Sequence, residues 1–319
     1  MNRLAFSVGG LLYTPATNAG VAAHIRDGDW PGLSSICLCL EDSIQDSALD
    51  EAEARLARTL SELDGLRRPL PMVFVRVRSP EHLKRVHERI SDARDALTGY
   101  VFPKFDLANA RAYLDALDAI NARRERPLCA MPILESRAVA QVSTRREHLA
   151  ALRELLDAHC GDILNIRVGG NDFCNLFGLR RAVNQTIYDL GVVRDILVDI
   201  VNMFSDDYVV SGPVWEYYGA NTGAAWAKGL RRELALDVAN GFLGKTAIHP
   251  VQLPVIRESL KVSAADAADA RRVLSWSDDR LAVAGGEGRM NEVKCHARWA
   301  ERVLLRARIY GIREENPDD

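Results

Sequence analysis

Eight short apolar runs, separated by stretches with helical spacing, are the feature that most limits how this chain can fold. Several runs are almost continuously apolar, which is typical of strands buried on both faces of a parallel sheet. The stretches between them, such as 46–63 and 106–124, place apolar residues at helical intervals. Strands that alternate with helices predict a parallel α/β fold. The expected strands are 7–15, 34–41, 71–77, 99–104, 128–135, 163–170, 206–212 and 245–250.

The number of runs favours a TIM (β/α)₈ barrel over the alternative, a doubly wound sheet. The chain has 319 residues, enough for a barrel of about 250 residues and an appendage. We assign residues 1–262 to a TIM-barrel catalytic domain and 263–319 to a C-terminal helical extension or lid, because the alternation stops there. Within the extension, 265–284 and 291–311 are expected to be helices on either side of a Gly-rich break.

Charge and composition narrow the class of protein. The formal net charge of −3 indicates no broad basic surface, so nucleic acid is not an expected partner. The first 18 residues hold an apolar run too short to span a membrane and lack the layout of a signal peptide, which predicts a cytoplasmic protein without a membrane partner. The six cysteines lack the spacing of metal sites, so we expect reduced thiols.

Polar residues end most of the predicted strands, where the active site of a TIM barrel lies. Glu135 and Asp172 follow neighbouring strands, and two carboxylates can hold a hard cation such as Mg²⁺, with water and substrate oxygens as its other ligands. Such a metal stabilises negative charge on a 2-keto acid or its enolate. The set favours retro-aldol or Claisen-type cleavage of a carboxylate-bearing substrate. The polar residues at the strand ends are Glu41, Asp42, Arg76, Arg78, Lys104, Glu135, Asn171, Asp172 and His249.

Each of these residues also has a purely structural interpretation. Asp42 suits the cap of the following helix, and Arg76 suits a structural ion pair, although its planar fork also matches a carboxylate. Lys104 and His249 suit roles in the fold. The pair 169–170 suits any tight turn, although glycine also lets the backbone approach a ligand closely. The coincidence of these residues at strand ends is what favours a site.

Seven motifs resemble, in order, those of the HpcH/HpaI aldolase and citrate lyase β-subunit family, to which malyl-CoA lyases belong. The resemblance covers residues 8–260, roughly, and implies a TIM barrel with a carbon–carbon lyase activity of the oxo-acid-lyase class. AIHPVQ and the LED-plus-AR pair are fairly specific for the family. The other motifs support the resemblance because they occur in the same order as in the family. The motifs are LLYTPATN, ICLCLEDSIQDSALDEAEARL, FVRVR, VFPK, PILES, RVGGNDF and KTAIHPVQLPVI.

The resemblance implies a role for the charged residues. Glu135 and Asp172 would be ligands of Mg²⁺, and Mn²⁺ accepts the same ligands. Arg76 would bind the substrate carboxylate. Glu41 and Asp42 would hold metal-bound waters or orient Arg76, and are therefore grouped with it as catalytic residues.

The resemblance also implies substrate contacts and a second source of acid/base chemistry. The backbone at Gly169 and Gly170 would meet the keto acid, and Lys104 and His249 would bind the substrate. The segment GRMNEV resembles a G-x-M-[IV]-D element of the family, which supplies an acid/base carboxylate from the C-terminal extension to a neighbouring subunit's site. Glu292 stands at the aspartate position and would act in proton transfer. Its structural interpretation is that it begins the last helix.

Other features indicate a divergent branch, which resembles the TIM-barrel C–C bond lyases linked to tellurium-resistance gene clusters. They are a long insertion between Glu135 and Asp172, the pair Arg180-Arg181, and the aromatic loop 211–226. The expected ligands are a small keto acid or hydroxy acid, free or as a CoA thioester, and the expected assembly is a homo-trimer or homo-hexamer. The alternatives are a thioester hydrolase on the same barrel and a non-catalytic scaffold.

Overall fold

The structure is a computed structural model that describes residues 2–66, 68–90, 95–276, 283–285 and 289–314. The chain divides into two compact units, Met1–Ile256 and Arg257–Asp319. None of the described helices is long and apolar enough to span a membrane. All six cysteines are free thiols, and Cys37 and Cys39 lie buried in a strand as expected.

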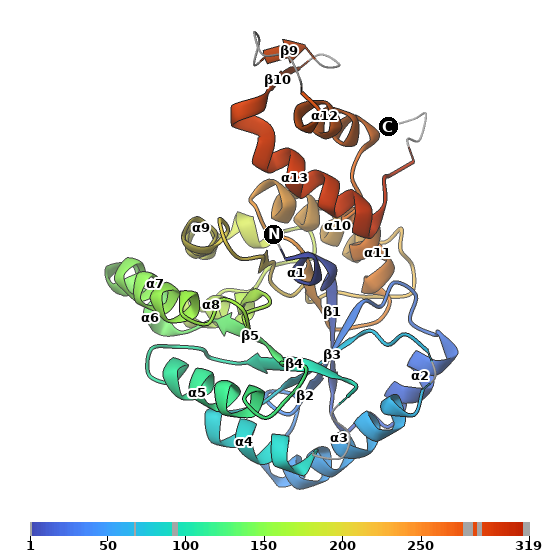
Figure 1. Cartoon of the computed structure of the whole chain (residues 1–319), viewed down its shortest axis with the longest axis vertical. Helices are drawn as coiled ribbons and strands as arrows, with labels where there is room; N and C mark the ends of the chain where they lie inside the picture. Colours follow the sequence, from blue (N-terminus) through green and yellow to red (C-terminus); the bar gives the residue numbers. More distant parts are fainter. Residues whose placement is uncertain (1, 67, 91–94, 277–282, 286–288, 315–319) are drawn as a thin grey trace. The chain divides into compact units, whose positions relative to one another are not determined.

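The first unit is built on eight parallel strands in the order β7-β6-β5-β4-β3-β2-β1-β8. In Figure 1, strands β1 to β5 are labelled, and helices α3 (Leu49–Asp64), α4 (Pro80–Arg89) and α5 (Ala110–Asn121) lie outside them. A parallel bridge between Gly212 and Lys245 joins the two end strands and closes the sheet into a barrel. The TIM-barrel prediction is therefore confirmed. The strands are β1 Gly10–Pro15, β2 Ser35–Cys39, β3 Met72–Arg76, β4 Leu97–Phe102, β5 Cys129–Leu134, β6 Ile166–Val168, β7 Val210–Ser211 and β8 Lys245–Ala247.

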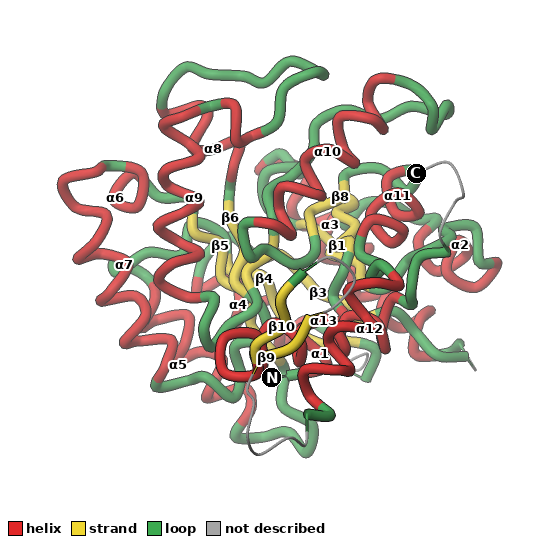
Figure 2. The backbone as a smooth tube through the Cα atoms, turned by 90° about the horizontal axis from the view of Figure 1, so that it is seen from above, coloured by secondary structure: helices red, strands yellow, loops and turns green. Residues whose placement is uncertain are grey.

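Helices surround these strands, which lie together at the centre of the unit (Figure 2). In the third helix, Ala52, Leu56, Leu60 and Leu63 recur at helical spacing and are buried against the barrel. The helices are α1 Arg3–Ser7, α2 Val21–Asp27, α3 Leu49–Asp64, α4 Pro80–Arg89, α5 Ala110–Asn121, α6 Arg137–Ala140, α7 Val142–Asp157, α8 Gly170–Leu176, α9 Gly191–Phe204, α10 Ala225–Ala239 and α11 Gln252–Ser259, with 3₁₀ turns η1 Asp46–Ala48 and η2 Ile187–Asp189.

Most strand boundaries differ from the prediction by one to four residues, and two of these differences have a local cause. The first run was expected to be extended over 7–15, but Ser7 ends helix α1 and the strand begins at Gly10. The side chain of Asn2 accepts a hydrogen bond from the backbone N–H of Leu4, which caps this short helix. The fourth strand begins at Leu97, two positions before the predicted start, because Leu97 pairs with Val73 of β3.

A fully buried ionic network links α10 to β8. The Lys245 Nζ atom lies 2.7 Å from Glu233 Oε1 and 2.8 Å from Asp237 Oδ2. Arg181 reaches the same carboxylate, with its Nη1 atom 2.9 Å from Glu233 Oε2. The hydroxyl of Tyr188 donates to Asp237 Oδ1 at 2.8 Å. The network therefore holds β8 to the helix that packs outside it.

The second unit is a helical pair with a small hairpin. It consists of α12 Ala264–Leu274, β9 Val283–Gly285, β10 Met290–Glu292 and α13 Val293–Tyr310. The predicted helix over 265–284 is wrong at its end, because β9 pairs antiparallel with β10. The last helix also begins later than predicted, since Asn291 is in β10 and donates to buried Asp269 at 2.9 Å. The core of the unit contains Val262, Ala267, Ala270, Val273, Ala300 and Val303.

Candidate active site

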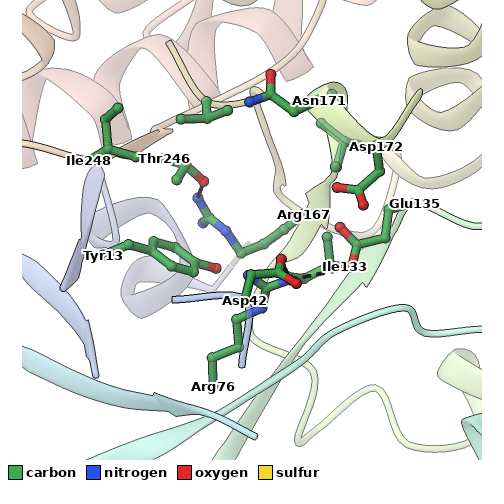
Figure 3. A pocket seen from close by; sticks show the side chains of 14 residues that line it. Tyr13, Asp42, Arg76, Ile133, Glu135, Arg167, Asn171, Asp172, Thr246 and Ile248 are labelled. Carbon is green, nitrogen blue, oxygen red and sulfur yellow. Dashed lines mark hydrogen bonds and ion pairs between the residues drawn. The ribbon is translucent and has the colours of Figure 1, made fainter. Parts of the chain in front are cut away.

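A cavity of about 260 Å³ lies at the carboxyl ends of the strands (Figure 3). Because the strands are parallel, the residues that follow them meet at one edge of the barrel, as expected for this fold. The volume lies below the range of about 300–1,000 Å³ that is typical for drug-sized ligands, which suits a small substrate. The cavity is lined by Tyr13, Asp42, Arg76, Ile133, Glu135, Arg167, Val168, Gly169, Gly170, Asn171, Asp172, Val214, Thr246 and Ile248.

Two carboxylates face each other in this cavity (Figure 3). Glu135 follows β5 and is 6% exposed, and Asp172 lies in the first turn of α8. Gly169 lies close to both side chains: a Cβ atom at this position would be 2.2 Å from Glu135 Oε2 and 3.1 Å from Asp172 Oδ2. Only glycine leaves both side chains in place at this position.

The electrostatic environment of Glu135 disfavours its ionised form. Burial raises the pKa of Glu135 to about 8; the charge of Arg76 opposes this rise, and the neighbouring Asp172 adds to it. Two carboxylates side by side repel each other when both are ionised. A cation bound between them would remove that repulsion.

The donors at this position fit Mg²⁺ rather than a metal enclosed by protein ligands. Among the described residues, no three or more His, Cys, Asp or Glu side chains are grouped as a metal site. Mg²⁺ is usually held by one or two carboxylates and keeps several waters, whereas a structural zinc site needs four protein ligands. The pair Glu135 and Asp172 meets the first requirement and not the second.

Arg76, at the end of β3, is the centre of a cluster of charged groups. Its Nη2 atom lies 2.8 Å from Glu41 Oε2, 3.1 Å from Asp42 Oδ2 and 3.6 Å from Glu135 Oε1. Burial disfavours the charged guanidinium, but Tyr13, Glu41 and Glu135 together raise the pKa of Arg76 above its ordinary value. Its buried Nε atom has no hydrogen-bond partner among the described residues, which is rare for a buried donor.

Glu41 and Asp42 respond differently to the same neighbours. Burial raises the pKa of Glu41, against the charges of Arg76 and Lys104. Burial also acts to raise the pKa of Asp42, but the hydrogen bond with Glu41 and the charges of Arg76 and Lys104 outweigh it, and the pKa is lowered. Both carboxylates contact Arg76, as the expected orienting role requires.

Lys104 contacts the acidic residues from outside the cavity lining. Its backbone N–H donates to Glu135 Oε1 at 2.7 Å, and its Nζ atom lies 2.6 Å from Glu41 Oε1. Among the described residues it is the one non-glycine residue with a positive φ, of 48°. The hydrogen bond from the backbone N–H means that Lys104 positions the Glu135 carboxylate through its backbone.

His249 and Glu292 lie outside the described lining of the cavity. The His249 ring stacks on Tyr218 with the centroids 4.4 Å apart, and its Nδ1 atom accepts from the N–H of Val251 at 3.3 Å. Glu292 precedes α13 in the second unit, and its N–H donates to His296 Nδ1 at 2.9 Å. The glycine of the same segment, Gly288, lies outside the described residues, and the acid/base role of Glu292 stays a prediction.

Sequence reasoning missed one charged residue of the cavity, Arg167 in β6. It is 1% exposed, and its Nη2 atom donates to Thr246 Oγ1 at 2.6 Å. Tyr13 was missed as well; its ring centroid lies 5.9 Å from Arg76 Cζ. The available signal was alternation, since Asn165 and Arg167 are two positions apart in an apolar strand and therefore point to the same side.

Comparisons with known proteins agree with the TIM-barrel fold. A family described as C–C bond lyases of the TIM-barrel fold matches residues 2–312. No curated protein matches the sequence.

Solved structures of similar fold share little sequence with the chain. A CitE protein of Mycobacterium tuberculosis, determined with magnesium, acetoacetate and coenzyme A, is 20% identical with a TM-score of 0.64, over 95% of this chain and 99% of that one. A citrate lyase of Burkholderia xenovorans LB400 is 16% identical with a TM-score of 0.75, over 97% and 94%. A Haloferax volcanii malate synthase is 14% identical with a TM-score of 0.60, over 78% and 72%. At these identities the likeness concerns the fold.

Proposed function

This chain belongs to the family of C–C bond lyases of the TIM-barrel fold, and from that membership we propose that it is a Mg²⁺-dependent lyase of the oxo-acid-lyase class. Its substrate would be a carboxylate-bearing hydroxy acid or the acyl-CoA thioester of one. The bond would break by retro-aldol or retro-Claisen chemistry, with a small keto acid passing through its enolate, or would form in the reverse direction. The carboxylate pair across Gly169, beside Arg76, is the observation that carries this proposal.

In this proposal each charged residue has one task. Glu135 and Asp172 hold Mg²⁺, which supplies Lewis-acid stabilisation of negative charge on the substrate oxygens when bound. Arg76 binds the carboxylate of the keto acid, for which its unpartnered Nε atom is available. Glu41 and Asp42 fix the guanidinium of Arg76 through the contacts described above. Mn²⁺ would suit the same donors.

Neighbouring structures support small acids as ligands. The M. tuberculosis CitE structures include one with magnesium, acetoacetate and coenzyme A and another with oxaloacetate and magnesium. The small cavity agrees with an acid of this size. The substrate contacts of Gly170, Lys104 and His249, the proton transfer by Glu292, the cytoplasmic location and a trimeric or hexameric assembly are further parts of the proposal.

Calorimetry with and without Mg²⁺ tests the proposal directly. Pyruvate, oxaloacetate and glyoxylate are titrated into the wild type and into Asp172→Ala. We expect at least one keto acid to bind only with Mg²⁺, and the variant to lose about tenfold or more in affinity. Asp195→Ala is the matched control, because Asp195 is an exposed aspartate of α9 that pairs with Arg194. Loss of binding in both variants, or binding without Mg²⁺, would contradict the metal site.

A second readout separates catalysis from binding. An enzyme that stabilises the enolate of pyruvate lets the methyl protons of pyruvate exchange for deuterium in heavy water. NMR follows this exchange. Exchange that needs Mg²⁺ and Asp172 supports a lyase. Release of CoA from thioesters without cleavage of a C–C bond would favour the hydrolase alternative. Binding without either reaction would favour a non-catalytic scaffold.

A further inference from the structure

Arg167 is a buried cation without an anionic partner. It is 1% exposed, and no carboxylate of the described residues lies within ion-pair distance of its guanidinium. Its contacts are neutral: Nη2 donates to Thr246 Oγ1 at 2.6 Å and Nη1 to Asn165 Oδ1 at 3.4 Å. The Nε atom has no partner among the described residues. Burial of a charge without a counter-ion is costly, and a structure tolerates it where a ligand completes the pair.

Other buried arginines of the same unit are paired. Arg145 lies 2.7 Å from Asp199 Oδ2, and Arg181 lies 2.9 Å from Glu233 Oε2. These two are held in the fold by carboxylates of the protein. Arg167 differs from them in its partners and also in its location, because it lines the cavity.

The position of Arg167 relative to the carboxylate pair defines two ends of the cavity. Its side chain extends from β6 toward Tyr13 and Thr246, away from Glu135 and Asp172 (Figure 3). One end of the cavity therefore carries the negative pair that suits a metal. The other carries a guanidinium whose Nε and Nη donors suit the two oxygens of a carboxylate.

We propose that Arg167 binds a second carboxylate of the substrate, so that the substrate is a free dicarboxylic acid. This inference rests on the proposed function: the keto-acid end occupies the site of Glu135, Asp172 and Arg76, and the far carboxylate pairs with Arg167. A thioester carbonyl at the far end is neutral and would leave the buried charge uncompensated. The chemistry of this end of the cavity therefore selects a free carboxylate over a thioester.

Calorimetry on the full-length, Mg²⁺-loaded protein tests this inference with acids that differ at the far end. Pyruvate has one carboxylate, whereas oxaloacetate and 2-oxoglutarate have two. We expect the wild type to bind one of these dicarboxylates about 10- to 100-fold more tightly than pyruvate, the value of a charge-assisted hydrogen bond in a buried site. Arg167→Met should reduce this ratio to about twofold or less and leave the pyruvate affinity nearly unchanged.

A matched variant and a stability measurement exclude a merely structural role. Arg145→Met also removes a buried arginine, yet it should lower the melting temperature and leave the dicarboxylate-to-pyruvate ratio unchanged. Arg167→Met should melt no lower than wild type without ligand, because it removes an unpaired charge. If Arg167→Met does not fold, Arg167→Lys, which keeps the charge and loses the fork, must weaken dicarboxylates selectively.

Different outcomes overturn different statements. Mg²⁺-dependent binding of pyruvate without a preference for dicarboxylates would overturn this inference and leave the proposed function standing, as would an equal loss of both acids in Arg167→Met. If acetate added with pyruvate reproduced the dicarboxylate affinity, Arg167 would bind a separate acid, and the inference would be wrong. The absence of any keto-acid binding would overturn the proposed function and the inference with it.

Discussion

At the scale of single residues, the site depends on how closely the backbone passes its carboxylates. Gly169 has no left-handed φ, so its identity is not explained by backbone conformation. It is explained by space, because any side chain there would meet the carboxylate of Glu135. The glycine is therefore part of the proposed metal site without being a ligand.

Replacement of Gly169 by alanine tests this explanation. We expect Gly169→Ala to lose about 10- to 100-fold in Mg²⁺ affinity, because Glu135 must move, and to cost about 1–3 kcal/mol of stability from overpacking. Calorimetry and urea unfolding measure the two effects. Gly161→Ala is the control, since a Cβ there meets nothing within 4 Å. Unchanged Mg²⁺ affinity in Gly169→Ala would show that Glu135 does not bind the metal.

The protonation of Glu135 gives the metal-free protein a pH-dependent stability. Its pKa in the folded state, about 8, is above the ordinary carboxyl value. A pKa that is higher in the folded state stabilises the fold fully at a pH below the pKa of the unfolded state, about 4.3. This contribution is lost as the pH rises through the pKa of the folded state. We expect the unfolding free energy of the wild type in EDTA to fall between about pH 5 and pH 9, by at most about 1.4 kcal/mol per pH unit for this proton.

Urea unfolding of Glu135→Gln across the same pH range isolates this contribution. The variant cannot ionise at this position, so its curve should be flatter than that of the wild type. Mg²⁺ should also flatten the wild-type curve, because the metal binds the ionised carboxylate. Equal slopes in the wild type and the variant would contradict the raised pKa.

The residues of the candidate site differ in how far sequence alone could identify them. Glu135 and Asp172 were predicted because a carboxylate that ends an apolar strand has few structural uses. Arg167 was not, because only tertiary neighbours distinguish a paired arginine inside a strand from an unpaired one. The backbone role of Lys104 was equally hidden, since its hydrogen bond to Glu135 joins residues that are distant in the sequence and does not involve the Lys104 side chain.

At the scale of elements, the network between α10 and β8 holds buried charges in place. Glu233 contacts both Lys245 and Arg181, so Glu233→Gln would leave Lys245 with Asp237 and Arg181 with only a longer contact, 3.9 Å, to Glu216. We expect a loss of about 3–5 kcal/mol in urea unfolding, the usual result of breaking a buried ion pair. Asp195→Asn, in an exposed pair, should cost about 1 kcal/mol or less. Similar losses in the two variants would show that the network adds no more than a surface pair.

Helices and strands were predictable where their sequence pattern was long. The predictions failed where a few individual contacts determine the structure. The alternation of apolar runs located all eight strands of the barrel, because strands buried on both faces must be apolar. Helix α1 was missed because a single cap, from Asn2, determines its five residues. The β9–β10 hairpin was missed because Asn291 and Asp269, far apart in sequence, hold it by a buried hydrogen bond.

At the scale of the whole molecule, the family resemblance that the motifs indicated is confirmed by the match over residues 2–312. The residues that line the cavity belong to the first unit, Met1–Ile256. Glu292, the proposed acid/base residue, belongs to the second. We therefore expect the first unit alone to keep ligand binding and to lose proton transfer.

A chain that ends at residue 262 tests this separation. We expect it to fold, to bind Mg²⁺ and keto acid within about threefold of the full chain, and to lose deuterium exchange at pyruvate. Calorimetry and NMR measure the two properties, and circular dichroism checks the fold. Glu292→Gln in the full chain should reproduce the loss of exchange. Full exchange by either protein would remove Glu292 from the mechanism.

The closure of the barrel has a consequence for its motions. β1 and β2 are joined through five registered pairs, from Leu11–Ser35 to Pro15–Cys39, whereas β7 and β8 meet at the single pair Gly212–Lys245. Transient opening of the native state begins where the fewest backbone bonds must break. Amide hydrogens along this seam should therefore exchange with solvent before those of β1 and β2. Thr246 follows Lys245 in β8 and also lines the cavity, so slower exchange along the seam would report that a ligand has bound.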